Sequence, residues 1–177
     1  ADQLKQVSEF QAQMFSQIDP ASAGCELMKD LRARYAAALE KARVPEAERE
    51  QRMERIAGEL ASVNATDTAM HLVDQTILSP AAKALQTRFA EDQKTRAQLQ
   101  QALVVVYMRI GLCDAALPLQ VAALDTRRSV LGRYDTETIA STSTMAQLLL
   151  RQGKLGEAES FAREAVENSR RMLGETD

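Results

Sequence analysis

Apolar residues recur at helical spacing through the first half of the chain. The first eighteen residues carry them three and four positions apart, which predicts a helix that ends near Gln17. Similar spacing predicts a second helix capped by Ser22, a third that begins at Pro45, and a fourth over about residues 67–90. Ser79-Pro80 interrupts the fourth, either as a kink within one helix or as the start of a new one.

The second half is more regular and predicts two pairs of helices. Their expected bounds are 94–110, 114–131, 136–151 and 155–173. One glycine follows each predicted end, where a left-handed residue closes a helix at little cost; these are Gly111, Gly132, Gly153 and Gly174. The whole chain is therefore expected to be all-α.

The same glycines indicate an internal repeat, because 153 − 111 and 174 − 132 both equal 42. When residues 99–135 are placed on residues 141–177, eight of 37 positions are identical, against roughly three expected by chance. Small alanines on the second helix of each unit would let the paired helices approach closely; they are Ala116, Ala123, Ala158 and Ala165. Each unit is a helix–turn–helix hairpin that buries its apolar face by stacking on the next.

Composition supports a helical, globular chain. Hydrophobic residues make up 45% and charged residues 27% of the 177 positions, and Gly and Pro together number only 7 + 4 = 11. The formal net charge is −3 and neither half is strongly basic, so we expect no nucleic-acid partner. No apolar run approaches the roughly 18 residues of a membrane-spanning helix, so we expect a soluble chain without direct membrane insertion.

The repeated segments resemble a known family. Residues 151–159 (RQGKLGEAE), Arg163-Glu164-Ala165 and residues 170–177 (RRMLGETD) resemble a tetratricopeptide repeat. The 42-residue spacing resembles the long form found in kinesin light chains. Residues 107–132 resemble the same pattern, with Cys113 in place of the usual aromatic after the turn. The resemblance implies a right-handed superhelical stack of helix hairpins with an N-terminal helical cap.

The expected domain boundaries follow from this repeat. Residues 1–66 show no repeat and are expected to form the cap, residues 67–93 a degenerate repeat or linking helix, and residues 94–135 and 136–177 the two repeats. The layout also resembles, weakly, the tetratricopeptide tails of bacterial membrane-anchored serine/threonine kinases. A sensor or regulatory region of a larger signalling protein is therefore the alternative to a scaffold module.

Few residues could carry catalysis or bind a metal. His71 is the only histidine, and we interpret it as a surface or structural residue of a helix. Cys25 and Cys113 form no metal-ligand pattern and are expected to be buried thiols, with a disulfide as the alternative. Paired carboxylates such as Glu46-Ala47-Glu48 fit solvated helix faces better than a hydrolytic site. We expect no enzyme activity, cofactor or metal; a deep polar pocket around His71 would favour an enzyme instead.

In tetratricopeptide proteins the first helices of successive repeats line a concave groove that holds peptides. The resemblance therefore implies a non-catalytic scaffold or adaptor module whose partner is a protein or peptide. Carried onto this chain, it places the groove residues on two helices: Gln98, Gln101, Val105, Met108 and Arg109 on the first, and Ala140, Ser143, Gln147, Leu150 and Arg151 on the second. Their amide and hydroxyl groups could hydrogen-bond an extended backbone, and the arginines could meet acidic groups.

Two further features bear on partners. Arg128 and Arg170 recur at the repeat period, each beside a second arginine. The pairs Arg127-Arg128 and Arg170-Arg171 would either form a ridge for an acidic or phosphorylated peptide or cap helix ends. Asp177 aligns with Asp135, which opens a first helix, so we expect a fragment of a longer array or a partner over the last apolar face. Self-association through that edge is an alternative. The partner's identity and the compartment, cytoplasmic or extracytoplasmic behind a membrane span, do not follow from the sequence.

Overall fold

The computed structural model describes residues 19–174, and every regular element in that range is helical. This confirms the expected all-α class. The described residues divide into two compact units, one ending at Ile77 and the other beginning at Leu78. The helix predicted to end near Gln17 lies outside the described residues.

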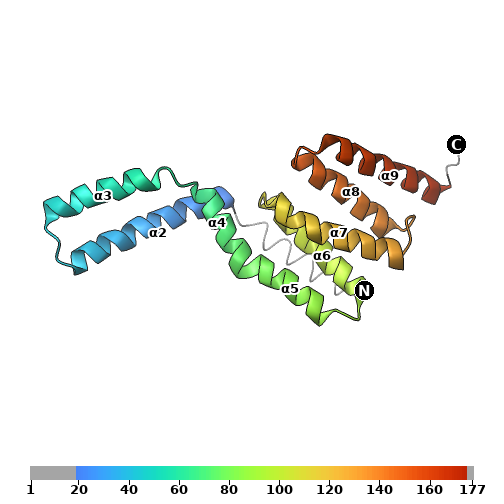
Figure 1. Ribbon diagram of the computed structural model, residues 1–177, viewed down its shortest axis with the longest axis horizontal. Helices are drawn as coiled ribbons and strands as arrows, with labels where there is room; N and C mark the ends of the chain where they lie inside the picture. Colours follow the sequence, from blue (N-terminus) through green and yellow to red (C-terminus); the bar gives the residue numbers. More distant parts are fainter. Residues whose placement is uncertain (1–18, 175–177) are drawn as a thin grey trace. The chain divides into compact units, whose positions relative to one another are not determined.

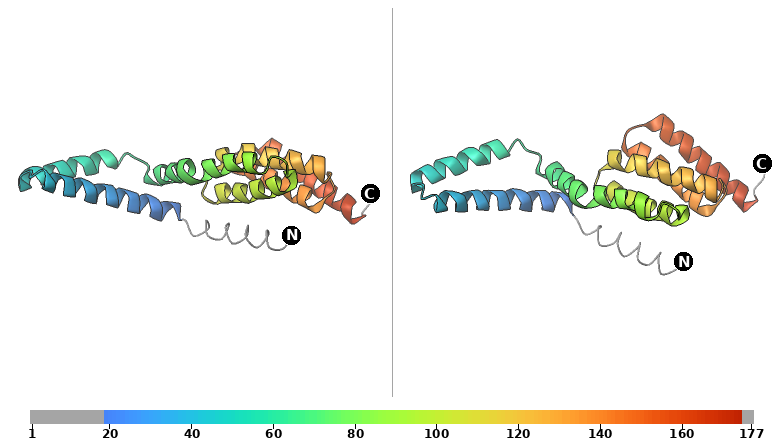
Figure 2. Two further views of the ribbon diagram at one scale, coloured as in Figure 1. Left: turned by 90° about the horizontal axis from the view of Figure 1, so that it is seen from below. Right: turned by 60° about the horizontal axis from the view of Figure 1, so that its bottom comes forward.

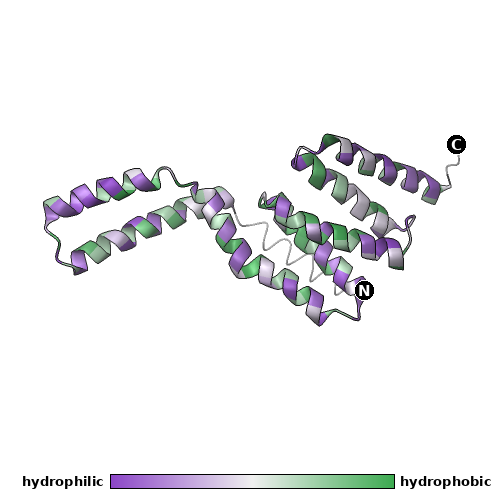
Figure 3. Ribbon diagram, viewed as in Figure 1, coloured by the Kyte–Doolittle hydropathy of each residue, from purple (hydrophilic) through white to green (hydrophobic). Residues whose placement is uncertain are grey.

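The first unit contains three helices, α2 (Pro20–Lys41), α3 (Glu46–Leu60) and α4 (Ala65–Val73). The views in Figures 1 and 2 agree that α2 and α3 lie side by side in opposite directions, and α4 packs on α2. No residue of α3 is buried, and most of its residues are hydrophilic, as the colours of its ribbon show (Figure 3). This unit therefore has a thin apolar core, in which Leu39 of α2 and Met70 of α4 are buried.

The N-terminus of α2 differs from the prediction. Asp19, not Ser22, is the N-cap, and its carboxylate accepts hydrogen bonds from the backbone N–H groups of Ala21 and Ser22. The Ser22 hydroxyl donates to the same carboxylate at 2.6 Å. The hydrogen bonds from Ser22 and Ala21 hold the pKa of Asp19 below its usual value. Pro20 takes the first helical position, where its missing N–H costs nothing, so Asp19-Pro20 begins a helix.

The chain stays helical through Ser79-Pro80. A π-helical segment, η1 (Asp74–Leu78), joins α4 to α5 (Ser79–Arg88). Pro80 has no N–H to donate to the carbonyl four residues earlier, and its ring crowds that carbonyl. The wider π turn just before the proline lets the helix continue past it.

The second unit continues with α6 (Gln93–Arg109), α7 (Cys113–Val130), α8 (Thr136–Arg151) and α9 (Leu155–Leu173). These bounds agree with the predicted bounds to within one residue. The four glycines have positive φ angles of 84°, 85°, 76° and 78°, as the left-handed helix ends require. Figure 1 shows α6 with α7 and α8 with α9 as two hairpins, and α7 packs against α8.

Small side chains lie where the helices of each hairpin meet. The four alanines at positions 116, 123, 158 and 165 are all buried, as the repeat predicted. Leu124 of α7, Met145 and Leu149 of α8 and Ala158 of α9 form one continuous apolar cluster. The stack is therefore built from tight helix pairs that share a core across the α7–α8 contact.

Candidate functional site

The residues predicted to line a concave groove lie on α6 and α8, the first helix of each hairpin. Six of them expose their side chains: Val105 and Arg109 on α6, and Ala140, Gln147, Leu150 and Arg151 on α8. Val105 is 37% exposed and Leu150 is 58% exposed, which is high for aliphatic side chains. The two helices therefore present both apolar and polar groups to solvent.

The remaining predicted residues are less accessible. Gln98, Gln101 and Ser143 are half-buried, and Met108 is 7% exposed, so its side chain belongs to the core. Arg151 is held within the molecule, because its Nη1 donates to the Met108 carbonyl at 2.8 Å. That bond joins the C-terminal ends of α6 and α8. Some of the predicted residues are therefore free to contact a partner, whereas others are buried or bind the neighbouring hairpin.

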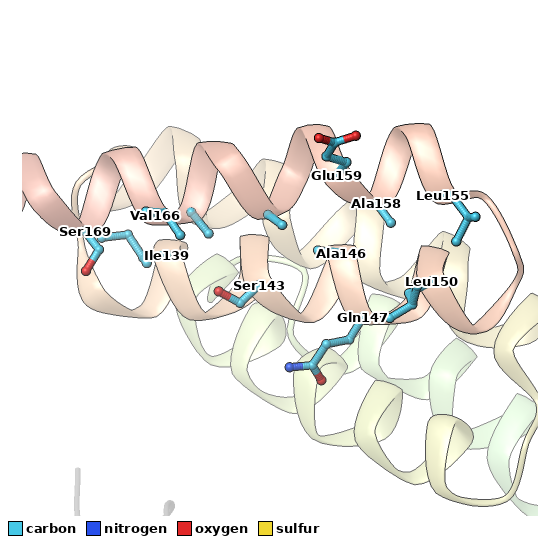
Figure 4. Close-up of a pocket in the computed structure, with 12 residues that line it drawn as sticks. Ile139, Ser143, Ala146, Gln147, Leu150, Leu155, Ala158, Glu159, Val166 and Ser169 are labelled. Atoms are coloured by element: carbon cyan, nitrogen blue, oxygen red, sulfur yellow. The ribbon is translucent and has the colours of Figure 1, made fainter.

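An open groove of about 620 Å³ runs between α8 and α9 and is called the end groove below (Figure 4). Three of its lining residues, Ser143, Gln147 and Leu150, were predicted to bind a partner. The others lie on both helices, and most are small or aliphatic: Ile139, Ala146, Leu155, Ala158, Glu159, Ala162, Ala165, Val166 and Ser169. Glu159 carries the only charge in this lining.

Residues 95–171, which span α6 to α9, match the family described as tetratricopeptide repeat. These residues form tetratricopeptide repeats. The match covers the two helix hairpins that the 42-residue spacing predicted. No curated protein and no solved structure matches the chain.

A buried polar network joins the two tetratricopeptide repeats, and the sequence did not predict it. Gln101 Oε1 on α6 accepts hydrogen bonds from Arg127 Nη1 of α7 and Ser141 Oγ of α8, both at 2.9 Å. Gln120 Nε2 of α7 donates to the Ser141 carbonyl at 2.7 Å and to its hydroxyl at 3.1 Å. Gln120 and Arg127 interrupt the apolar stripe of α7, and a polar residue at such a position is the signal that could have found them.

The Arg127 guanidinium lies inside this network and also pairs with Glu137, with Nη2 and Oε2 3.6 Å apart. Burial lowers the pKa of Arg127, while the carboxylates of Glu137 and Asp135 act in the opposite direction and favour its charged form. Arg127 is therefore a fixed contact between the repeats. It does not belong to an exposed arginine ridge, which corrects that expectation.

The Arg128 side chain also makes contacts within the molecule. Its Nη2 donates to both carboxylate oxygens of Glu164 on α9, at 2.7 and 2.8 Å, and its guanidinium lies 5.9 Å from the centre of the Phe161 ring. The equivalent Arg170 is exposed, and its side chain makes no hydrogen bond or ion pair with residues 19–174. The arginine pairs therefore repeat in sequence but not in their contacts.

Replacing Arg128 by alanine should lower the free energy of unfolding by about 0.5–1 kcal/mol, since both partners of the ion pair are about one-third exposed. Urea unfolding followed by circular dichroism measures this change. Arg170→Ala, one repeat later, is the matched control and should leave the midpoint unchanged. Equal effects of the two substitutions would contradict the assigned role of the Arg128–Glu164 pair.

The residues considered for catalysis are not brought together. His71 is exposed on α4, as expected for a surface histidine. Cys25 is exposed, contrary to prediction, because it lies on the solvent side of α2; Cys113 is half-buried, and both are free thiols. Among residues 19–174, no three His, Cys, Asp or Glu side chains converge as a set that could hold a metal ion.

Among residues 19–174, no helix has the length and apolar character that crossing a bilayer requires.

Proposed function

We propose that this chain is a non-catalytic interaction module that binds an extended segment of a partner protein along α6 and α8. Tetratricopeptide repeats generally mediate protein–protein interaction. The observation that carries the proposal is the pairing of exposed aliphatic side chains, Val105 and Leu150, with the exposed cation of Arg109 on the same two first helices.

The chemistry of these side chains defines the partner. The Arg109 side chain makes no hydrogen bond or ion pair with residues 19–174, so its guanidinium is available to a carboxylate or phosphate. Val105 and Leu150 gain free energy when an apolar side chain covers them. Gln98 and Gln147 can donate to and accept from a peptide backbone. The partner segment therefore combines an acidic residue with an aliphatic one, and the small surface favours an affinity in the micromolar range or weaker.

Arg109→Glu should weaken this binding at least about tenfold, because an attractive charge pair becomes a repulsive one. The probe is a peptide selected from a random extended-peptide library displayed on phage, with its affinity measured by isothermal titration calorimetry. Arg151→Glu is unsuitable for the test because Arg151 bonds the Met108 carbonyl, so its loss would disturb the packing of the repeats.

The control is Arg170→Glu, which makes the same change of charge at an exposed arginine of α9. It should leave the affinity within a factor of two of the original. If both variants weaken binding equally, the interaction depends on net charge and the surface along α6 and α8 is not the site. If neither does, the partner lies elsewhere on the chain.

A further inference from the structure

The end groove has an internal counterpart in the same chain. A shift of 42 residues carries Ser143, Ala162 and Ser169 of the end groove onto Gln101, Gln120 and Arg127. On the first repeat those positions are covered by α8, which packs on α7. Ser141 of α8 hydrogen-bonds Gln101 and Gln120, and Glu137 of α8 forms an ion pair with Arg127. In the first repeat, the face that corresponds to the end groove is therefore covered by a helix.

The covered face of the first repeat and the end groove differ in the side chain that they can accommodate on a covering helix. On the first repeat, long polar side chains crowd the position of Ser141 and hydrogen-bond it. At the end groove, the equivalent positions hold a serine, an alanine and a serine, which are short and offer no such long donors. A serine at the equivalent position of a covering helix would leave empty space there, whereas a large aliphatic side chain would fill it.

The geometry points to an amphipathic helix of a partner protein as the occupant of the end groove, with a Leu, Ile, Met or Phe at the position that Ser141 holds in α8. The exposed side chains of Leu150, Leu155 and Val166 supply apolar surface along the groove (Figure 4). Glu159, the only charged residue of the lining, already forms an ion pair with Arg163 at 2.7 Å, so the groove favours a helix face without charged side chains.

A second copy of the chain fits less well. Two end grooves that face each other are both concave, so neither provides the ridge that the other needs. The end groove shares Gln147 and Leu150 with the proposed peptide surface. The inference does not rest on the proposed function, because Ala162 and Val166 lie on α9, whereas Val105 and Arg109 lie on α6 and do not line the groove.

The test uses three fluorescein-labelled peptides and the 177-residue chain. One peptide has the sequence of α8, residues 136–151; the second carries Ser141→Leu; the third carries Ala140→Leu, which adds a leucine outside the buried stripe. Fluorescence anisotropy should show that the Ser141→Leu peptide binds at least about tenfold more tightly than the other two, because only its leucine enters the space beside Ala162.

Two variants of the chain test whether the Ser141→Leu peptide binds in the end groove. Ala162→Arg puts a long cation into the groove and should abolish binding of the Ser141→Leu peptide. Ala122→Arg, at an exposed alanine of α7 outside the groove, should not change it, and circular dichroism should show equal helicity for both variants. Arg109→Glu should also leave this binding unchanged, which distinguishes a failure here from a failure of the proposed function.

Three results would overturn the inference. The first is equal affinity of the three peptides, and the second is an equal loss on Ala162→Arg and Ala122→Arg. The third is a concentration-dependent dimer, measured by light scattering, that dissociates on Ala162→Arg, since a second copy would then fill the groove.

Discussion

Replacement of Gly24 by alanine should lower the free energy of unfolding of the unit that ends at Ile77 by about 2–3 kcal/mol. Gly24 is buried where α2 crosses the start of α4, and an added Cβ would lie 2.7 Å from backbone atoms of Ala65 and Thr66. Backbone atoms cannot move aside as a flexible side chain can, so the two helices would have to separate. Urea unfolding followed by circular dichroism measures the loss.

Gly58→Ala is the matched control for this prediction. Gly58 lies within α3 of the same unit, and no atom lies within 4 Å of its added Cβ. Alanine should stabilise the helix there by up to about 1 kcal/mol, because glycine is a poor helix former. A Gly24→Ala variant as stable as the original chain would show that α2 and α4 do not make this close contact.

Arg127→Ala should lower the free energy of unfolding of the repeats by about 2–4 kcal/mol. The substitution removes a buried guanidinium, takes one hydrogen bond from Gln101 and leaves the Glu137 carboxylate without its ion-pair partner. It also opens a cavity between α6, α7 and α8. The exposed Arg170→Ala should change the stability by less than about 0.5 kcal/mol.

Arg127→Met separates packing from charge in that result. Methionine restores much of the volume but neither the hydrogen bond nor the ion pair, and it still leaves the Glu137 carboxylate without its partner. If Arg127→Met is as damaging as Arg127→Ala, the polar contacts dominate. If Arg127→Ala itself is harmless, the network around Gln101 does not hold the repeats together.

The repeats could be predicted closely because their signals are local. Gly111 and Gly153 mark helix ends by a backbone conformation that other residues rarely adopt, and the 42-residue offset fixes which helices correspond. The start of α2 was misplaced because Asp19 and Ser22 are both good N-caps, and the choice depends on Pro20. In that case the competing signals were equally local, so spacing could not decide between them.

The candidate site was predicted less completely, because it depends on contacts between repeats. Met108 has the spacing of a groove residue, yet it is buried in the core. Gln101 and Arg151 have suitable chemistry for binding a peptide, but their polar atoms bond to neighbouring helices. Helical periodicity gives the face of a helix, whereas the neighbour that covers this face becomes known only from the packing.

The main contacts among α5 to α9 run between helices that are consecutive in the chain. In such a linear arrangement, local opening can begin at an end and leave the rest intact. The last helix, α9, packs mainly on α8 and buries just three residues, so its amide protons would exchange with deuterium before those of α7 or α8. Any molecule seated between α8 and α9 would cover part of this helix and slow its local opening.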